Sequence, residues 1–200
     1  MPILSLAFVI ILMLFRFKAR SFFEKNIKKL FWIPVAAVFS LAAIFSFMQY
    51  RVWLDNEMTK YLLPPHSGIG YFAIFAFFRF FAPYILSFIL SALLSLAMIR
   101  VNKRSGGKFF EDDEIYIAFL GGFLSGYPGF IFYLVGLVFV YLIIHLSKTV
   151  IGKKGGLSRS ARARSEVIPL YNLWLPVSAS VIIIYVLWLS HTALWKLLSL

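Results

Sequence analysis

The chain has 200 residues, of which 62% are apolar and only 14% are charged, and 23 of them are phenylalanine. A water-soluble domain of this size cannot hide so much apolar surface, because a large share of any small globule lies at its boundary. A bilayer core of about 30 Å needs roughly 20 apolar residues for each helical crossing. The composition therefore predicts an all-α fold, a polytopic integral membrane helix bundle, and it excludes an ordinary soluble domain.

The charge balance is strongly basic, with 20 Lys and Arg residues against eight Asp and Glu residues and a net charge of +12. The basic residues fall in short segments between apolar runs, where the positive-inside rule accounts for them without any nucleic-acid partner. We therefore expect the segments 16–29, 100–114 and 148–166 to lie on the cytoplasmic side of the inner membrane. Cysteine is absent, which excludes disulfides, thiolate metal sites and thiol nucleophiles.

The first part of the chain predicts a helix over 2–15, a short surface helix over 16–29 and a spanning helix over 30–50. The run 2–15 has no basic region before it and no small-residue cleavage site after it. We therefore expect a retained helix and not a removable signal peptide. In 16–29 aromatic side chains are interleaved with Lys and Arg, which is typical of helices that lie in the membrane interface.

The stretch 67–99 is apolar but contains Pro83. Proline removes a backbone hydrogen bond from a helix, so the stretch predicts either one long tilted helix or two short ones, 67–81 and 83–99. The choice decides where the nearly neutral loop 51–66 lies. One crossing places that loop outside, and two crossings place it in the cytoplasm.

The apolar stretch 115–147 contains a Gly-x-Pro-Gly sequence at 126–129, which favours a turn. It therefore predicts two helices, 115–126 and 129–147, followed by the last hydrophobic segment over 167–195. The whole chain is expected to form one transmembrane helical domain of about six to seven hydrophobic segments, some short or broken at proline.

Acidic residues are scarce, and the run Glu111–Glu114 directly precedes the apolar segment from Ile115. One interpretation is that these carboxylates stabilise the start of the helix through its free N–H groups and macrodipole. Another is that one of them pairs with Asp55 or Glu57. Two carboxylates that share a proton can activate water for amide hydrolysis, because repulsion between like charges raises one pKa and leaves the other low.

Other groups carry weaker signals. His66, His145 and His191 lack the spacing of metal ligands, so we expect no metal site, and no motif predicts a bound cofactor. Arg79, inside an apolar run, is either a buried counter-ion or a side chain that reaches back to the interface. A set of small residues predicts close helix approach: Gly121, Gly122, Ser125 and Gly126.

From the acidic run onward, the order of features resembles the type IV prepilin peptidases, membrane aspartic proteases with a GxGD motif. That family has an acid at a helix start, a Leu-Gly step, a spanning helix, a basic loop and a last helix that opens Ile-Pro. An acid also lies seven residues before the proline of an upstream Leu-Pro sequence. The matching residues here are Asp113, Leu120-Gly121, Ile168-Pro169, and Glu57 before Leu63-Pro64.

The sequence departs from the family at several motif positions. Phe110 and Asp112 occupy the places of the two motif glycines, and Pro65 replaces the acid of Leu-Pro-Asp. Glu57 takes the place of an aspartate, and Asp55 lies two residues from that position. Glycine lets backbone approach a substrate closely, so the bulky Phe110 would fill space near the acid. The resemblance therefore extends further for the fold than for the activity.

The resemblance implies a divergent prepilin-peptidase-like hydrolase. In this hypothesis Asp113, with Asp112 beside it, pairs with Glu57 or Asp55 to cleave the basic leader peptide of a pilin-like substrate. Both acids must then face the cytoplasm, which requires 67–99 to cross twice. The alternative is a non-enzymatic membrane scaffold or assembly subunit, whose basic loops contact partners or anionic membrane lipid. A small-solute transporter is a third hypothesis, without an acid chain or an internal repeat to favour it.

Overall fold

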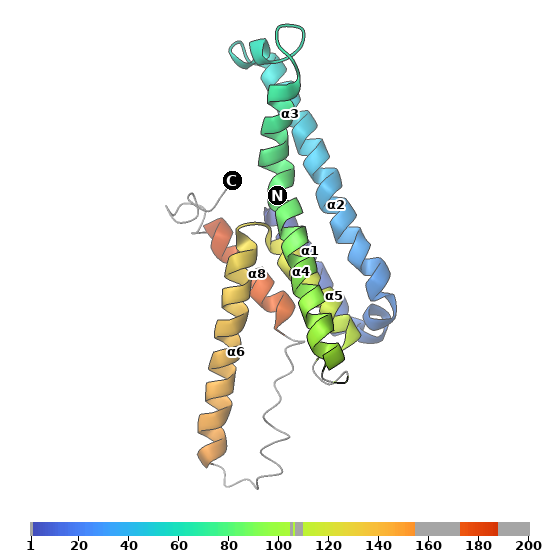
Figure 1. The fold of residues 1–200 in the computed structure, drawn as a ribbon, viewed down its shortest axis with the longest axis vertical. Coiled ribbons are helices and arrows are strands. Elements are labelled where there is room, and N and C mark those ends of the chain that lie inside the picture. The colour runs from blue at the N-terminus through green and yellow to red at the C-terminus, as the bar shows by residue number, and fades with distance from the viewer. Residues whose placement is uncertain (1, 105, 107–109, 155–172, 188–200) are drawn as a thin grey trace.

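The computed structural model describes residues 2–104, 106, 110–154 and 173–187, and every regular element among them is helical (Figure 1). Three helical stretches are long and apolar enough to cross a membrane: Lys25–Asp55, Gly70–Arg104 and Gly129–Ser147. Their length and composition support a multi-pass membrane protein, as the composition predicts.

The described residues form α-helices, one 3₁₀ helix and one π-helical turn. In chain order they are α1 (Pro2–Lys18), α2 (Arg20–Asp55), the 3₁₀ helix η1 (Thr59–Leu62), α3 (Gly70–Ala76), the π-helical η2 (Phe77–Phe81), α4 (Ala82–Arg104), α5 (Asp112–Ser125), α6 (Gly129–Lys154) and α8 (Trp174–Leu187).

Two long rods run from the upper end of the molecule, and α6 extends below their lower ends (Figure 1). Helix α2 runs its full length to the loop 56–69, α3 and η2 return beside its upper part, and α4 continues toward the lower end (Figure 1). We call the loop 56–69 the tip, and the opposite end, which holds residues 16–29, 100–104 and 110–114, the base. Helices α1, α5 and α8 are shorter and lie beside the base half of the rods, while residues 45–81 form an outer hairpin (Figure 1).

The expected break at Pro83 is absent, because the chain stays helical from Gly70 to Arg104. The turn that precedes the proline, Phe77–Phe81, widens into a π-helix. A proline ring clashes with the carbonyl of the preceding turn in a regular α-helix, and a wider turn gives that ring room. The stretch is therefore one long helix, and the tip lies at the opposite end from the base.

The segment 16–29 also differs from the expectation of a separate surface helix. Helix α2 begins at Arg20 and continues for 36 residues through the apolar run. Its first turns are amphipathic, since Phe23 and Ile27 are buried whereas Lys25 and Lys28 are exposed. The buried pair joins the main core, which holds this basic part of the helix in line with the rest of α2.

The expected division of the stretch 115–147 is present. Helix α5 ends at Ser125 and α6 begins at Gly129, with Gly126 at φ +64° and ψ 165°. Glycine reaches this backbone conformation without the steric penalty that other residues incur. The hairpin of α5 and α6 thus reverses direction part of the way up the rods, and both of its arms lead toward the base (Figure 1).

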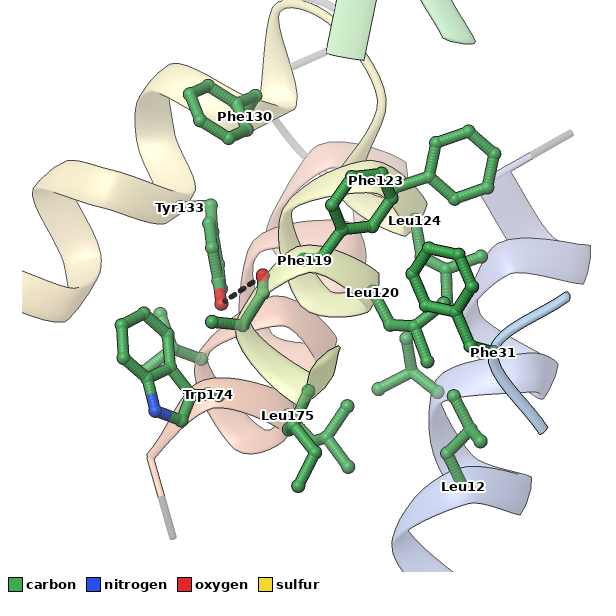
Figure 2. Close-up of a cluster of buried hydrophobic side chains, with 14 of the residues drawn as sticks. Leu12, Phe31, Phe119, Leu120, Phe123, Leu124, Phe130, Tyr133, Trp174 and Leu175 are labelled. Atoms are coloured by element: carbon green, nitrogen blue, oxygen red, sulfur yellow. Dashed lines mark hydrogen bonds between the residues drawn. The ribbon is translucent and has the colours of Figure 1, made fainter. Parts of the chain in front are cut away.

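The main core lies in the base half and is centred on α5 (Figure 2). Leu120 and Phe123 of α5 are 1% and 0% exposed, with Phe31 of α2 on one side and Tyr133 of α6 on the other. A second, much smaller cluster joins Leu63, Phe72 and Ala76 in the outer hairpin. The fold therefore concentrates its packing around a short central helix.

The last expected segment, 167–195, is described only in part. Helix α8 covers Trp174–Leu187 and packs against α1, α5 and α6. The Ile168-Pro169 pair and His191 lie outside the described residues, as does the part 155–166 of the basic segment.

Candidate functional site

The two groups of acids that form the predicted dyad lie at opposite ends of the molecule. Asp55 is the last residue of α2 and Glu57 belongs to the tip, and both side chains are exposed. Asp113 lies in the first turn of α5, at the base. The 35-residue helix Gly70–Arg104 connects the two ends, which corresponds to about 52 Å at 1.5 Å per residue. The structure therefore does not bring these carboxyls together.

The acidic run occupies the start of α5 in the way that the helix-dipole interpretation predicts. Glu111 is the N-cap residue, in an extended backbone conformation and without a side-chain capping hydrogen bond. Asp112, Asp113 and Glu114 follow in the first turn of the helix. Carboxylates at these positions interact favourably with the positive end of the helix dipole.

Glu114 is buried and has a defined hydrogen-bond partner. Its side chain is only 5% exposed, and the indole Nε1–H of Trp174 donates a hydrogen bond of 2.8 Å to its Oε1. Glu114 lies in the first turn of α5 and Trp174 begins α8, so the bond joins the base ends of two neighbouring helices. A buried carboxylate needs such a donor, because desolvation without compensation is costly.

Arg16, on a third helix, lies near enough for its charge to act weakly on Glu114. It lies near the end of α1 and is also only 5% exposed. Burial raises the pKa of the Glu114 carboxyl above its ordinary value, while the hydrogen bond from Trp174 and the charge of Arg16 act in the opposite direction. Arg16, Glu114 and Trp174 thus form a buried polar group, here called the base triad, outside the three long apolar helices.

Above the base triad, hydroxyl groups connect α4, α5 and α8. The Ser87 hydroxyl on α4 donates to the carbonyls of Gly122 and Phe123, at 2.9 and 3.1 Å. On the other side of α5, the Ser178 hydroxyl donates to the Gly121 carbonyl at 2.9 Å. Interhelical bonds of this kind stabilise helix pairs where no water competes for the polar groups.

The two central glycines of α5 allow this close approach. A Cβ atom added at Gly121 would lie 2.7 Å from the hydroxyl oxygen of Tyr133 and 3.2 Å from the Trp174 carbonyl oxygen. At Gly122 it would lie 2.7 Å from Ser91 Oγ and 2.9 Å from the Phe130 ring. Both positions therefore need glycine, which confirms the small-residue packing face predicted from the sequence.

The turn between α5 and α6 is tied to the long helix. The backbone N–H of Tyr127 donates to the Pro83 carbonyl at 3.0 Å, and Gly126 and Pro128 are buried. Irregular backbone at membrane depth is tolerated where protein satisfies its polar groups. Pro83 thus supports the turn of the neighbouring hairpin instead of breaking its own helix.

The remaining predicted groups are scattered. His66 packs against Tyr61 at the tip and His145 stacks on Tyr141 in α6. Within the described ranges, no three His, Asp or Glu side chains gather closely enough to hold a metal ion. Arg79 is exposed on the π-helical turn, with Phe77 and Phe78 exposed beside it, which agrees with a side chain that reaches toward the interface.

Comparisons with models of known protein families, with curated proteins and with solved structures find no match to this chain. Its function is therefore inferred from the arrangement of its own residues. Sequence reasoning identified Glu114 only as part of the acidic run and did not identify Arg16 or Trp174 as its partners. The one available signal was position, since each of the three stands at a boundary between an apolar helix and a basic segment.

Proposed function

We propose that this chain is a non-enzymatic multi-pass membrane scaffold or assembly subunit. The observation that supports this most directly is the separation of the acids. Asp55 and Glu57 are at the tip, Asp113 is at the base, and Glu114 is held by Trp174. A water-activating dyad needs two carboxyls close enough to share a proton, and this arrangement offers none among the described residues.

The spacing of charged residues along the two rods supports a membrane-spanning length for each of them. On α2 the run between Lys29 and Arg51 corresponds to about 33 Å, and on the returning helix the run between Arg79 and Arg100 corresponds to about 31 Å. Both values match a hydrocarbon core of about 30 Å. The positive-inside rule then assigns the basic base to the cytoplasmic side and the tip to the outside of the inner membrane.

Helix α6 offers a surface on which a partner helix would pack. Beyond its contacts with α5 and α8, apolar side chains stand exposed toward its far end: Val138, Phe139, Leu142, Ile143 and Leu146. A scaffold needs such exposed apolar surfaces to bind a partner helix.

The topology is testable because the natural chain contains no cysteine. We would introduce Glu57→Cys at the tip and Lys103→Cys at the base, both at exposed positions, and label intact cells with a membrane-impermeant maleimide. The proposal expects labelling at position 57 only, and labelling at 103 after the cells are opened. Equal behaviour of the two positions would place both ends on one side and overturn this topology.

The prepilin-peptidase-like hypothesis remains a proposal with its own test. The order α5, α6, α8 matches what the resemblance implies, and this is the observation in its favour. We would co-express the chain with a pilin-like precursor and follow removal of the leader peptide. The scaffold proposal expects no cleavage by the wild-type chain. Cleavage that is lost in both Asp113→Asn and Glu57→Gln would contradict it and establish the protease.

A further inference from the structure

Exposed lysines gather where α1 meets α2 at the base. Lys18 ends α1, and Lys25, Lys28 and Lys29 stand exposed on the first turns of α2. Positions three and four apart share one face of a helix, so the three α2 lysines present their charges together. None of these lysines forms an ion pair with any side chain that the structure describes.

Exposed aromatic rings are interleaved with these lysines. Phe15 of α1 and Phe22 of α2 are 43% and 51% exposed, and their ring centroids lie 6.4 Å apart. Phe23 and Ile27, on the opposite face of the same helix, are buried in the main core. The core therefore holds α2 in place while Phe22 and the lysines face away from the protein.

This mixed surface lies at the expected depth of lipid headgroups. Lys29 marks the lower limit of the apolar run on α2, and Trp32, one turn further on, is 61% exposed. Tryptophan prefers the interface between headgroups and acyl chains. Rings at this level can enter the acyl boundary while lysines reach lipid phosphates.

A second basic group at the base lacks the rings. Arg100, Lys103 and Arg104 are exposed at the end of α4 and carry the same charge as the three α2 lysines. Their exposed apolar neighbour is the aliphatic Val101. The three α2 lysines and the three α4 cations thus carry equal formal charge and differ in their aromatic neighbours, which makes the α4 set a control for charge.

We propose that the α1–α2 corner, formed by Phe15, Lys18, Phe22, Lys25, Lys28 and Lys29, is a binding site for anionic phospholipid of the leaflet at the base. The lysines pair with headgroup phosphates, and the two phenylalanine rings insert beside the acyl chains. A zwitterionic lipid offers the same acyl chains without the net charge, so the site selects anionic lipid. The inference does not depend on what the scaffold assembles.

The test uses the full chain, purified in a non-ionic detergent and titrated with phosphatidylglycerol or phosphatidylcholine of the same acyl chains. Bound lipid is counted by native mass spectrometry. Each lysine near an anionic surface contributes about fivefold in affinity, so the triple substitution K25Q/K28Q/K29Q is expected to weaken phosphatidylglycerol binding on the order of 100-fold. K25R/K28R/K29R, which keeps the charge, should bind like wild type, and R100Q/K103Q/R104Q should lose less than about fivefold.

Phe22→Ser gives a second route if the glutamine triple does not fold, as checked by circular dichroism and elution volume. It keeps every charge and should weaken phosphatidylglycerol binding several-fold. Equal losses in the two glutamine triples, or equal binding of the two lipids by wild type, would overturn the site. A further control adds inorganic pyrophosphate at the same total anionic charge as the lipid. If pyrophosphate displaces the lipid, the site binds free phosphate and the proposal is overturned.

Discussion

The base half and the outer hairpin are both helical and apolar, yet they are held together differently. In the base, α5 lies among five other helices and is fixed by glycine contacts, serine hydroxyls and the base triad. In the outer hairpin two helices meet through aromatic rings such as Trp53 and Phe72, 5.3 Å apart, around a small cluster. Ring contacts tolerate adjustment, whereas interlocked backbone contacts do not.

This difference has a consequence for stability and for function. Because the surroundings of α5 leave no room for rearrangement, the base should unfold as one cooperative unit. The outer hairpin has fewer buried contacts and should open locally at a lower free energy. The comparison predicts that equivalent substitutions in the two regions have unequal effects, which can be measured one by one.

The largest effect is expected at the centre of the base. Gly122→Leu would drive a side chain into Ser91 and the Phe130 ring, where even a Cβ atom comes within 2.9 Å. Overpacking at a site without room should destabilise the folded protein by about 3 kcal/mol or more. Unfolding in mixed micelles with increasing SDS measures the loss. If this variant unfolds at the same midpoint as wild type, α4 and α5 can move apart at little cost. That result would contradict the close packing inferred for the base.

The base triad is expected to contribute next. Glu114→Ala leaves the buried indole N–H of Trp174 without its acceptor and Arg16 without its neighbouring charge. The loss should be about 1–3 kcal/mol in the same unfolding measurement. Glu111→Ala is the control, since this exposed N-cap residue forms no side-chain capping bond. If the two variants lose the same stability, the helix dipole and not the triad explains the role of Glu114.

The triad also predicts a pH dependence of known sign. Burial raises the pKa of Glu114 above 4.5 in the folded protein, so the folded state keeps this proton to a higher pH than the unfolded chain does. Its contribution to stability therefore falls as the pH rises from about 4.5 through the raised pKa, and is constant above it. The difference in unfolding midpoint between wild type and Glu114→Gln should follow this course. A difference that is flat with pH would contradict the burial effect.

These positions show how far the sequence could lead. The uncharged runs predicted long apolar helices, and the Gly-x-Pro-Gly pattern predicted the turn at 126–129. Both predictions were possible because each depends only on residues next to one another in the chain. The sequence could not decide whether the helix continues through Pro83, because a π-helical turn and a bond from Tyr127 accommodate the proline. Neither feature is visible in the residues next to it.

The candidate site was harder to predict for a similar reason. The carboxyls of Asp113 and Glu57 were paired because their order along the chain resembles that of the two acids in the protease family. Their positions in space depend instead on how many times the segment between them crosses the membrane. Trp174 donates to Glu114 from 60 residues away, and nothing in either neighbourhood marks the other. Hydrogen bonds between polar groups that are distant in sequence therefore become visible only in the packed structure, even where each helix is predicted correctly.

A smaller effect distinguishes two serines one turn apart on α4. Ser87→Ala removes the hydroxyl that bonds to the Gly122 and Phe123 carbonyls and should cost about 0.5–1.5 kcal/mol. Ser91 is equally buried, but its hydroxyl has no hydrogen-bond partner, so Ser91→Ala should be neutral or slightly stabilising. Unfolding of the two variants side by side tests whether hydrogen bonds or shape alone hold α4 to α5. Equal losses would favour shape.

The smallest effect is expected in the outer hairpin, and it has the opposite sign. Gly70 begins α3, and a Cβ atom added there meets nothing within 4 Å. Gly70→Ala should therefore stabilise the protein by about 0.4–1 kcal/mol, by reducing the freedom of the unfolded chain and favouring the helix. Hydrogen exchange across residues 45–81, which resolves local opening, is the appropriate measurement, with Gly121→Ala in the base as the matched substitution. Faster exchange in Gly70→Ala would mean that the added methyl group disturbs the packing of the hairpin. The hairpin would then be packed as closely as the base, and the proposed difference between the two regions would be wrong.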